Sequence, residues 1–425
     1  MEVYLVGGAV RDELLDFPVK DRDYVVVGQT PDAMLARGFK PVGKDFPVFL
    51  HPQSGDEYAL ARTEKKVGPG HGGFEVVADP SIGLEEDLLR RDLTINAIAR
   101  DLGTGEYVDP FGGRADLRAG VLRHVSDAFC EDPLRVLRVA RFSARYASLG
   151  FEVAPETMEL MQQMVAQGQL QELTVERVWA EVEKALSGPS PEVFVQVLRK
   201  CGALAVIAPE IDVLYGVPQV AEHHPEICSG IHTEMVVAQA SRLAPGDAQV
   251  AFAALVHDLG KGLTPREEWP RHINHEENGV EPVAQLCARW KVPGEYAALA
   301  RVVCQKHLVA HRTLESRPGT LLRLMESVDA FRHPQRMERF ILACEADSRG
   351  RLGFEGRDYS QARMMRETFQ VAAAERAHRF VDEGHSGPKV GELLRRARLQ
   401  AITQARGRIR KEIEETPAPG RMVFR

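Results

Sequence analysis

The chain has 425 residues, too many for one hydrophobic core, and its length predicts roughly three domains. Its 44% hydrophobic and 27% charged residues exclude wholesale disorder, and no apolar run reaches the roughly 18 residues of a membrane span. The net charge of -7 excludes a uniformly basic nucleic-acid coat. Six scattered cysteines indicate neither a zinc knuckle nor a disulfide framework, and the N-terminus shows no signal sequence, so we expect a cytoplasmic protein without a membrane anchor.

The chain begins with the pattern strand, glycine turn, helix. Residues 3–6 are apolar and predict a buried strand, Gly7 and Gly8 predict a tight turn, and residues 10–15 predict the opening of a helix. This order places backbone N–H groups and Arg11 where a phosphate would bind. A glycine pair alone is usually only a turn, so the phosphate-binding interpretation needs support from the neighbouring segment of the chain.

Two aspartates, Asp21 and Asp23, begin the next predicted strand, residues 21–27. Residues two apart on a strand point to the same face, so both carboxylates enter one small volume. Their repulsion is costly unless a cation neutralises it, and Mg²⁺ prefers such oxygen ligands. An isolated Asp-x-Asp is more often a solvated turn, but after a glycine turn and a helix it indicates a triphosphate held beside two metal ions.

The following residues complete a predicted α/β or α+β head. Residues 48–50 and 57–62 predict further strands. On the latter, Glu57 is either a third metal-binding carboxylate or, as we favour, a solvated edge residue. The glycine-rich residues 63–74 predict a mobile loop. Residues 90–97 predict a helix on which Asp92 and Asn96 share a face. These two side chains either bind one ligand together or form a solvated pair.

A basic helix is predicted after Pro133. Pro133 suits the first helical position, which makes Asp132 a candidate N-cap. Three arginines then recur every three residues and form one stripe. Such stripes are usually solvated, but here the opposite face is apolar enough to enter a core, so we expect the stripe to face a cleft. The stripe consists of Arg135, Arg138 and Arg141, and the apolar face of Leu134, Val136, Leu137, Val139 and Phe142.

The rest of the chain is predicted to be helical. Residues 155–186 predict a continuous amphipathic helix, and the break at residues 187–191 predicts a domain boundary. From residue 192 onward no convincing strand pattern occurs. A second basic patch, residues 389–411, contains eight basic residues against one acid, Glu392.

A group of histidines and aspartates in the second half predicts a metal site. A lone buried histidine is more often a satisfied core residue, but adjacent His257 and Asp258 at the end of an apolar helix, followed by Gly260 and Lys261, reverse that preference. Imidazole and carboxylate donors together suit a divalent ion. The candidate ligands are His232, His257, Asp258, His275, His307 and Asp347.

Five motifs, in this order and spacing, resemble those of class II tRNA nucleotidyltransferases over roughly residues 1–190, and the His-Asp half is similar to the HD domain of gammaproteobacterial CCA-adding enzymes. The resemblance implies an α/β nucleotidyltransferase head with a polymerase β-like mixed sheet, followed by an all-α neck, body and HD domain. The motifs are residues 7–12, Asp21-Arg22-Asp23, Arg90-Arg91-Asp92 with Asn96, residues 109–113 and residues 131–135.

Together these features predict five regions. They are a catalytic head (1–110), a helical neck with the nucleotide-selecting helix (111–190), a helical body (191–227), an HD phosphohydrolase domain (228–350) and a basic helical C-terminal tail (351–425).

The resemblance also implies roles for residues of the head. Asp21 and Asp23 would be catalytic and hold two Mg²⁺ ions while the tRNA 3′-hydroxyl attacks the α-phosphate of CTP or ATP and pyrophosphate leaves. Asp92 would contact the ribose. Asp132 and Arg135 would form hydrogen bonds with the edge of the base. For Asp132 this role competes with the N-cap interpretation. The loop after Arg62 would switch the enzyme from CTP to ATP. The nucleotide, mainly its phosphates, would be bound by Gly8, Arg11, Arg91, Arg138 and Arg141.

For the HD domain the resemblance implies phosphatase, 2′-nucleotidase and 2′,3′-cyclic phosphodiesterase activities on RNA ends. Lys261 would contact phosphate, and the metal would be nickel or magnesium. His275 and His307 fit the ligand set less well than the others. The implied ligands are His232, His257, Asp258 and Asp347.

Three alternative functions are compatible with these motifs. A poly(A) polymerase shares the head and most motifs, and a CC-only enzyme differs in product. A nonenzymatic RNA-binding protein is disfavoured by intact Asp21, Asp23 and Arg91. The expected partners are a tRNA 3′ end, CTP and ATP, with the chain acting as a monomer or homodimer.

Overall fold

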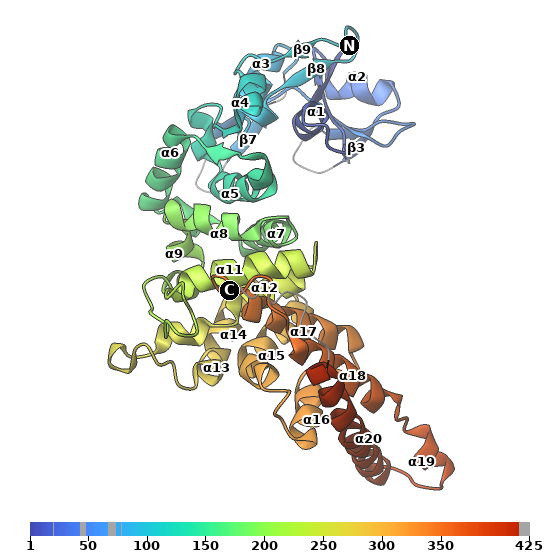
Figure 1. Ribbon diagram of the computed structural model, residues 1–425. Helices are drawn as coiled ribbons and strands as arrows, with labels where there is room; N and C mark the ends of the chain where they lie inside the picture. Colours follow the sequence, from blue (N-terminus) through green and yellow to red (C-terminus); the bar gives the residue numbers. More distant parts are fainter. Residues whose placement is uncertain (20, 43–47, 67–73, 78, 416–425) are drawn as a thin grey trace. The chain divides into compact units, whose positions relative to one another are not determined.

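The computed structural model describes residues 1–19, 21–42, 48–66, 74–77 and 79–415 (Figure 1). These residues form two compact units. The first consists of Met1–Glu181 and Val197–Ile207, and the second of Val182–Gln196 and Ala208–Arg425.

The first unit opens with a seven-stranded sheet of order β3-β4-β5-β2-β1-β8-β9. Strand β2 runs parallel to β5, whereas the other neighbouring pairs are antiparallel, so the sheet is mixed and the predicted fold class is confirmed. The strands are β1 (Glu2–Val6), β2 (Asp23–Val27), β3 (Lys40–Val42), β4 (Val48–Leu50), β5 (Glu57–Leu60), β8 (Ala99–Asp101) and β9 (Tyr107–Val108).

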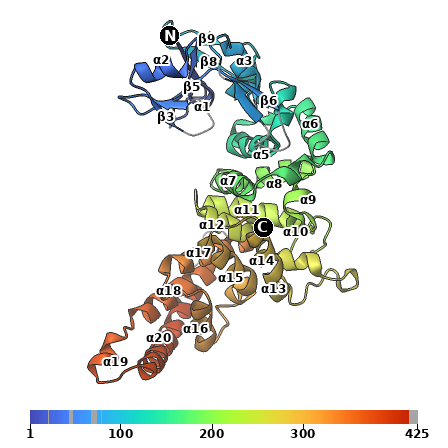
Figure 2. The same ribbon diagram turned by 180° about the vertical axis from the view of Figure 1, so that it is seen from behind.

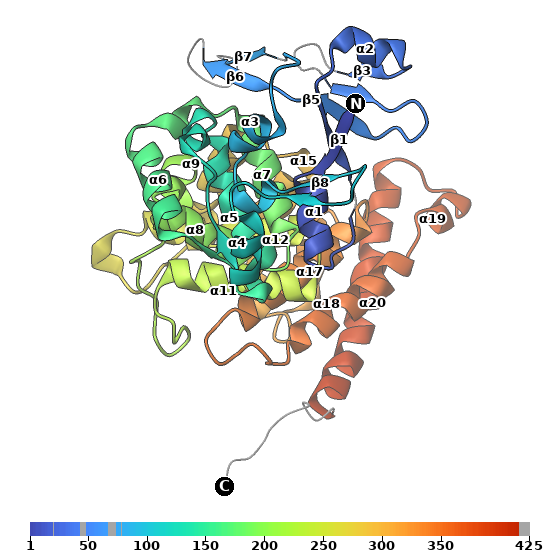
Figure 3. The same cartoon turned by 90° about the horizontal axis from the view of Figure 1, so that it is seen from above.

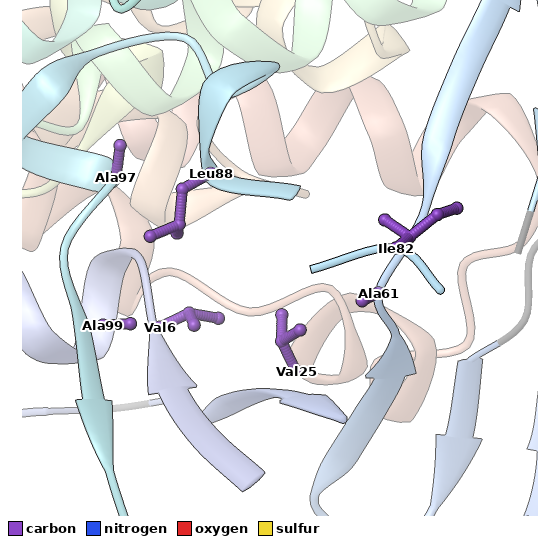
Figure 4. Close-up of a cluster of buried hydrophobic side chains, with 7 residues drawn as sticks. All are labelled: Val6, Val25, Ala61, Ile82, Leu88, Ala97 and Ala99. Carbon is purple, nitrogen blue, oxygen red and sulfur yellow. The ribbon is translucent and has the colours of Figure 1, made fainter. Parts of the chain in front are cut away.

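Alternation along the central strands builds a core on each face of the sheet. Val25 packs on one face and its neighbour Val26 on the other, because successive strand residues point in opposite directions. The Val26 face is covered by Met34 of α2 (Pro31–Ala36). The cluster on the Val25 face joins β1, β2, β8 and α3 (Leu84–Leu89) to the segments next to β5, α3 and β8 (Figure 4). It consists of Val6, Val25, Ala61, Ile82, Leu88, Ala97 and Ala99.

The structure corrects the predicted glycine-rich loop at both ends. Residues 63–66 and 74–77 form strands β6 (Thr63–Lys66) and β7 (Phe74–Val77), which pair antiparallel (Figure 3). Residues 67–73, where the nucleotide-switching loop was predicted, lie outside the described residues. Two strand boundaries also differ from the prediction. Strand β2 begins at Asp23 rather than Asp21, and β5 ends at Leu60 rather than Arg62.

The predicted helix over residues 90–97 is wrong. Helix α3 ends at Leu89, Leu93 is extended, and a single 3₁₀ turn follows at Thr94–Asn96. The physical reason is backbone pairing with a distant segment: Leu93 bridges His124, and the Thr94 N–H donates to the Arg123 carbonyl at 2.9 Å. Such tertiary pairing overrides local helix propensity.

The predicted basic helix is present as α5 (Leu134–Tyr146), which begins one residue after Pro133. Its apolar face is buried as expected. The predicted continuous helix over residues 155–186 is wrong, because Gly168 turns the chain with φ +74° between α6 (Pro155–Ala166) and α7 (Val175–Leu186). The remaining elements are α4 (Gly113–Ala119), β10 (Val121–Leu122), η3 (Asp127–Glu131), η4 (Ala147–Leu149), β11 (Glu152–Val153), α6 (Pro155–Ala166), η5 (Gln169–Glu172), α7 (Val175–Leu186), α8 (Pro191–Lys200) and α9 (Ala203–Ile207).

The second unit is helical, and its described residues contain no strand. Helix α12 (Ala248–Val256) is buried except at the partly buried Gln249. It packs against α11 (Ser229–Leu243), α15 (Gly294–His311) and α17 (Pro334–Arg349) (Figure 2), which explains its apolar run from Val250 to Val256. The other elements are α10 (Pro209–Asp212), α11 (Ser229–Leu243), η6 (Leu259–Leu263), η7 (Arg266–Glu268), α13 (His275–Asn278), α14 (Val280–Arg289), α15 (Gly294–His311), α16 (Pro318–Ser327), α17 (Pro334–Arg349), α18 (Ser360–Ala374), α19 (His378–Asp382) and α20 (Pro388–Glu415).

The basic patch predicted near the C-terminus lies on α20, which packs along α18. Among the described residues, no helix combines the length and the apolar character needed to cross a bilayer.

Candidate functional site

The carboxylates of the predicted Mg²⁺ site lie at the start of β2. Asp23 is its first residue, and Asp21 precedes it by two positions. Asp23 pairs in parallel register with Glu57, the first residue of β5, so the two side chains lie beside each other on one face. Strand β5 lies between β4 and β2, so Glu57 is not on an edge strand of the sheet. Its side chain is nevertheless solvent-exposed. The register therefore strengthens the third-carboxylate interpretation of Glu57.

Asp23 experiences opposing electrostatic effects. Its side chain is accessible, yet neighbouring protein atoms remove enough water to raise the pKa of its carboxyl group. Arg91 opposes this shift, and the like charge of Asp21 adds to it. A divalent cation would relieve the Asp21–Asp23 repulsion, so this donor set fits Mg²⁺.

The glycine turn lies against Arg91. Gly7 has φ +68°, and a Cβ built on it would be 2.7 Å from Nη1 of Arg91. Arg91 also pairs with Asp87 at 3.3 Å and is partly exposed. Helix α1 (Gly8–Leu14) begins at the next residue, Gly8. The turn and a cation are thus adjacent, as a phosphate-binding segment requires.

Arg11 lies inside the protein and not at the surface of the turn. It is 4% exposed and donates from Nε and Nη2 to Oδ1 of Asp12, at 2.9 and 2.7 Å, and from Nη1 to Oδ1 of Asn96 at 2.5 Å. Asp12 also accepts from Arg145 and Tyr146. This buried network was not foreseen, because the partners of Arg11 and Asp12 lie 85 positions away at Asn96 and 133 and 134 positions away at Arg145 and Tyr146.

Asp92 and Asn96 do meet, although not on a helix. Asn96 Nδ2 donates to Oδ1 of Asp92 at 2.8 Å, and Arg138 Nε donates to Oδ2 at 2.8 Å. Burial raises the pKa of Asp92, but the Arg138 guanidinium, the Asn96 hydrogen bond and the charge of Arg135 together outweigh it and hold the pKa well below its usual range. Asn96 therefore links Arg11 of the first motif to Asp92 and the arginine stripe.

The arginines of the stripe on α5 are held by acidic side chains and by backbone carbonyls. Arg141 Nε donates to Oε2 of Glu181 at 2.5 Å, and Glu181 also lies 4.0 Å from Arg138. Arg135 donates to the backbone carbonyls of Ala128 and Arg90, each at 2.7 Å. Glu181 was missed from the sequence, since nothing local marks it as the partner of a helix some 40 positions earlier.

Asp132 takes the predicted N-cap role and also pairs with an arginine of another helix. Its Oδ1 accepts from the Leu134 N–H at 3.1 Å, so the carboxylate caps the start of α5. Arg177 of α7 binds the same carboxylate bidentately, at 3.1 and 2.7 Å. Burial raises the pKa of Asp132, but Arg177 lowers it overall. The bidentate contact gives the two side chains defined positions, with a donor group and an acceptor group next to each other.

The histidines and aspartates of the second unit converge in one buried cluster. His232 Nε2 lies 3.2 Å from Oδ1 of Asp347, and His257 Nε2 lies 3.7 Å from the same oxygen. His257 Nε2 is also 3.1 Å from Oδ2 of Asp258. Each of these four side chains is at most 6% exposed. Three donors of one set, His232, His257 and Asp347, lie close enough together to hold one metal ion.

The electrostatics of this cluster fit a bound cation. Burial opposes protonation of His257, but the carboxylates of Asp258 and Asp347 outweigh it and raise the pKa of His257. Positive charge is therefore favoured at Nε2, and a metal ion supplies such charge in place of a proton. Lys261, predicted to contact phosphate, is buried and donates to Asp258 at 2.5 Å.

His275 and His307, which fit the implied ligand set less well, also reach the cluster. With Asp258 they form a second group of donors close enough together for one ion. Burial lowers the pKa of His307 to about 3, so its imidazole is neutral.

Two supporting residues were missed from the sequence. Glu226 lies 3.1 Å from Nδ1 of His232, and His311 Nε2 lies 2.7 Å from Oδ2 of Asp347. Such contacts orient metal ligands. No local motif contains them, because Glu226 lies in the segment before α11 and His311 ends α15.

Comparison with known proteins agrees with this architecture. Residues 3–123 match the family model "Poly A polymerase head domain", residues 150–214 match "Probable RNA and SrmB- binding site of polymerase A", and residues 230–339 match "HD domain". The chain is similar to the multifunctional CCA protein of Xanthomonas euvesicatoria, with 58% identity over 96% of this chain and 99% of the relative. The protein of the same name from Nitrosococcus oceani is 58% identical over 95% of this chain and 98% of the relative.

Solved structures show the same fold at lower identity. A CCA-adding enzyme in apo form II has a TM-score of 0.64 with 21% identity and covers 97% of this chain and 91% of its own. The Thermotoga maritima CCA-adding enzyme complexed with tRNA has a TM-score of 0.63 with 20% identity and covers 97% and 90%.

A mixed-sheet head with paired carboxylates, joined to a helical unit with an HD cluster, defines a nucleotidyltransferase with an attached HD domain. The chain belongs to the multifunctional CCA protein family. It is therefore an enzyme, a CCA-adding tRNA nucleotidyltransferase, and the nonenzymatic alternative is wrong.

Proposed function

We propose that the head adds C, C and A to the 3′ end of tRNA from CTP and ATP and releases pyrophosphate. The observation that carries this proposal is the pairing of Asp23 with Glu57 at the starts of two parallel strands, with Asp21 two positions before Asp23. The same sheet leads into the Gly7 turn, and Arg91 lies against that turn. Solved structures of CCA-adding enzymes with tRNA, ATP and CTP support the choice of partners.

Asp21 and Asp23 would hold Mg²⁺, with Glu57 as a further carboxylate. Such ions, when bound, neutralise the charge that develops on the triphosphate during in-line attack by the 3′-hydroxyl. Arg91 beside the glycine turn is the residue best placed for phosphate. Arg138 and Arg141 would share this task from α5, where Asp92 and Glu181 fix their guanidinium groups.

Asp132 and Arg135 would select the base. The bidentate hydrogen bonds from Arg177 position the Asp132 carboxylate. Arg135 is positioned by the hydrogen bonds that it donates to two backbone carbonyls. Fixed side chains can discriminate between bases because the wrong base leaves polar groups unpaired. Asp92, held by Arg138 and Asn96, would contact the ribose.

Product analysis tests this proposal directly. Purified protein receives Mg²⁺, tRNA lacking its 3′ end, and CTP and ATP separately or together, and the extended ends are sequenced. The expected product is CCA, made only when both triphosphates are present. A long A tail would show a poly(A) polymerase, and a product ending in CC would show a CC-only enzyme. With alanine at both Asp21 and Asp23, incorporation from labelled CTP should disappear.

We further propose that the HD cluster hydrolyses phosphate esters at RNA ends, as a phosphatase, 2′-nucleotidase and 2′,3′-cyclic phosphodiesterase. His232, His257, Asp258 and Asp347 would hold a divalent ion, nickel or magnesium, and the imidazole donors favour nickel. Lys261, beside Asp258, would contact the phosphate. His257→Ala should abolish hydrolysis of 2′,3′-cyclic AMP and leave nucleotide addition intact, whereas loss of both activities would indicate one shared site.

A further inference from the structure

The ring of Phe142 on α5 lies among three arginines of the first unit. Its centroid is 4.3 Å from the guanidinium carbon of Arg141, 5.0 Å from that of Arg11 and 5.7 Å from that of Arg138. Arg138 and Arg141 belong to the same helix, whereas Arg11 belongs to α1. Phe142 is 3% exposed, so water is largely excluded from these contacts. An aromatic face attracts cations within about 6 Å, and the attraction is stronger where water is excluded.

Tyr146, one helical turn after Phe142, extends this aromatic surface. The two rings lie at an angle of 3°, with their centroids 6.2 Å apart. The guanidinium carbon of Arg11 is 5.4 Å from the Tyr146 centroid, so it lies over both rings. The Tyr146 hydroxyl donates to Asp12, whose carboxylate also accepts from Arg11. Arg11 and the two rings therefore form one buried stack beneath the arginine stripe.

The acidic partners of the stripe leave some arginine donors unused. Arg141 donates to Glu181 from Nε alone, and its two terminal nitrogens have no acceptor among the described residues. Arg138 contacts one oxygen of Asp92 with Nε and Nη2, at 2.8 and 2.7 Å, whereas its Nη1 is 4.0 Å from Glu181. Guanidinium nitrogens are well suited to phosphate oxygens. The unused nitrogens are thus the donors that remain for a triphosphate.

The ring of Phe142 fixes what the hydrogen bond to Arg141 does not. A single hydrogen bond at Nε holds one edge of the planar guanidinium group and leaves its plane free to turn. A guanidinium group also stacks on aromatic faces, and such a contact fixes the plane. The negative charge of the ring face further offsets the repulsion among three like charges beside it.

We propose that Phe142 is a positioning residue for nucleotide addition, and that its ring orients Arg138 and Arg141 toward the triphosphate. The inference deepens the proposed addition of C, C and A, and it rests on the assignment of Arg138 and Arg141 to the phosphates. These arginines hold the phosphates both before and during the attack. Weakening their orientation therefore raises the KM for the triphosphate and leaves kcat nearly unchanged.

Fluorinated phenylalanines at position 142 of the full-length protein test this electrostatic role. Rings with one, three or five fluorines are introduced by nonsense suppression, since fluorine withdraws electrons from the ring face and changes its shape little. Addition of C to tRNA lacking its 3′ end is then measured. The KM for CTP should rise with each step, to about 10-fold for five fluorines, with kcat within about twofold. Inhibition by pyrophosphate should weaken in the same order, because pyrophosphate meets the same cations.

Phe129 provides a matched control in the same unit. It is 0% exposed and its ring packs against His124, but no guanidinium group lies over it among the described residues. The same fluorinated rings at position 129 should leave the KM for CTP unchanged. Thermal melting verifies folding, and if the ring with five fluorines prevents folding at position 142, the rings with one and three are compared.

Two results would overturn the positioning role of Phe142 while CCA synthesis by the unsubstituted protein upheld the proposed function. The first is a KM that is the same for every ring at position 142, because the ring would then only fill space. The second is an equal rise in KM at positions 142 and 129. No nucleotide addition by the unsubstituted protein would overturn both the role and the function.

Discussion

Arg138 Nε donates to Oδ2 of Asp92 at 2.8 Å and joins the loop after α3 to the middle of the basic helix α5. Asp92 is 7% exposed, and its other oxygen accepts from Asn96 and from the Leu93 N–H. The ion pair therefore fixes both a proposed ribose ligand and a proposed phosphate ligand.

This pair makes stability depend on pH. The pKa of Asp92 is lower in the folded than in the unfolded chain, so its contribution is complete above about pH 4, the ordinary aspartate pKa, and is lost as the pH falls further. Asp92→Asn should lower the free energy of unfolding by about 2 kcal/mol at pH 7, because Arg138 is one-third exposed and only part of the buried-pair energy applies. Urea unfolding between pH 3 and pH 7 should show this difference shrinking on acidification.

The exposed Asp32 provides the control for this experiment. Asp32→Asn should change stability by no more than about 0.5 kcal/mol at any pH. A D92N deficit that stayed constant down to pH 3 would show that the ion pair is not its source.

The Gly7 turn gives a second prediction, with Gly28 as its matched control. Both glycines have positive φ, but a Cβ at Gly7 would meet Arg91 at 2.7 Å, whereas at Gly28 nothing lies within 4 Å. Both substitutions to alanine should cost about 1 kcal/mol in backbone strain. Only Gly7→Ala should displace Arg91 and raise the KM for CTP and ATP. Equal kinetics for G7A and G28A would argue against a phosphate-binding turn.

The Asp132–Arg177 pair predicts a loss of base selection. Arg177→Ala removes the bidentate contact that holds Asp132, and discrimination between CTP and UTP should fall about 10- to 100-fold. Arg177→Lys should restore little, because an ammonium group cannot bind bidentately. Single-nucleotide incorporation with each triphosphate measures this. Arg118→Ala, at an exposed position on α4, should leave discrimination unchanged, and an unaltered preference in R177A would remove Asp132 from base selection.

Glu226 should act through His232. Its carboxylate lies 3.1 Å from Nδ1 of that ring, so Glu226→Ala should weaken Ni²⁺ binding at the HD cluster about 10- to 100-fold and leave CCA addition unchanged. Calorimetric titration in the D21A/D23A background measures the affinity. The nearby exposed Glu222 is the control, since Glu222→Ala removes the same charge without touching the ring. Equal affinities in E226A and E222A would leave Glu226 without a role in positioning His232.

The amino-acid sequence determined the features that depend on neighbouring residues. Strand β1, the glycine turn, the buried face of α5 and the apolar helix before His257 all follow from short-range periodicity and turn chemistry. The paired aspartates and the His-Asp pair were visible for the same reason.

Only the tertiary structure decided which distant side chains meet. Glu57 lies beside Asp23 because β2 and β5 run parallel in one register, and Arg177 reaches Asp132 from another helix. Residues 90–97 do not form the predicted helix, because Leu93 and Thr94 pair with residues 123–124. Local patterns record the preferences of a segment, whereas these contacts are decided by how segments far apart in the chain pack and satisfy each other's buried polar groups.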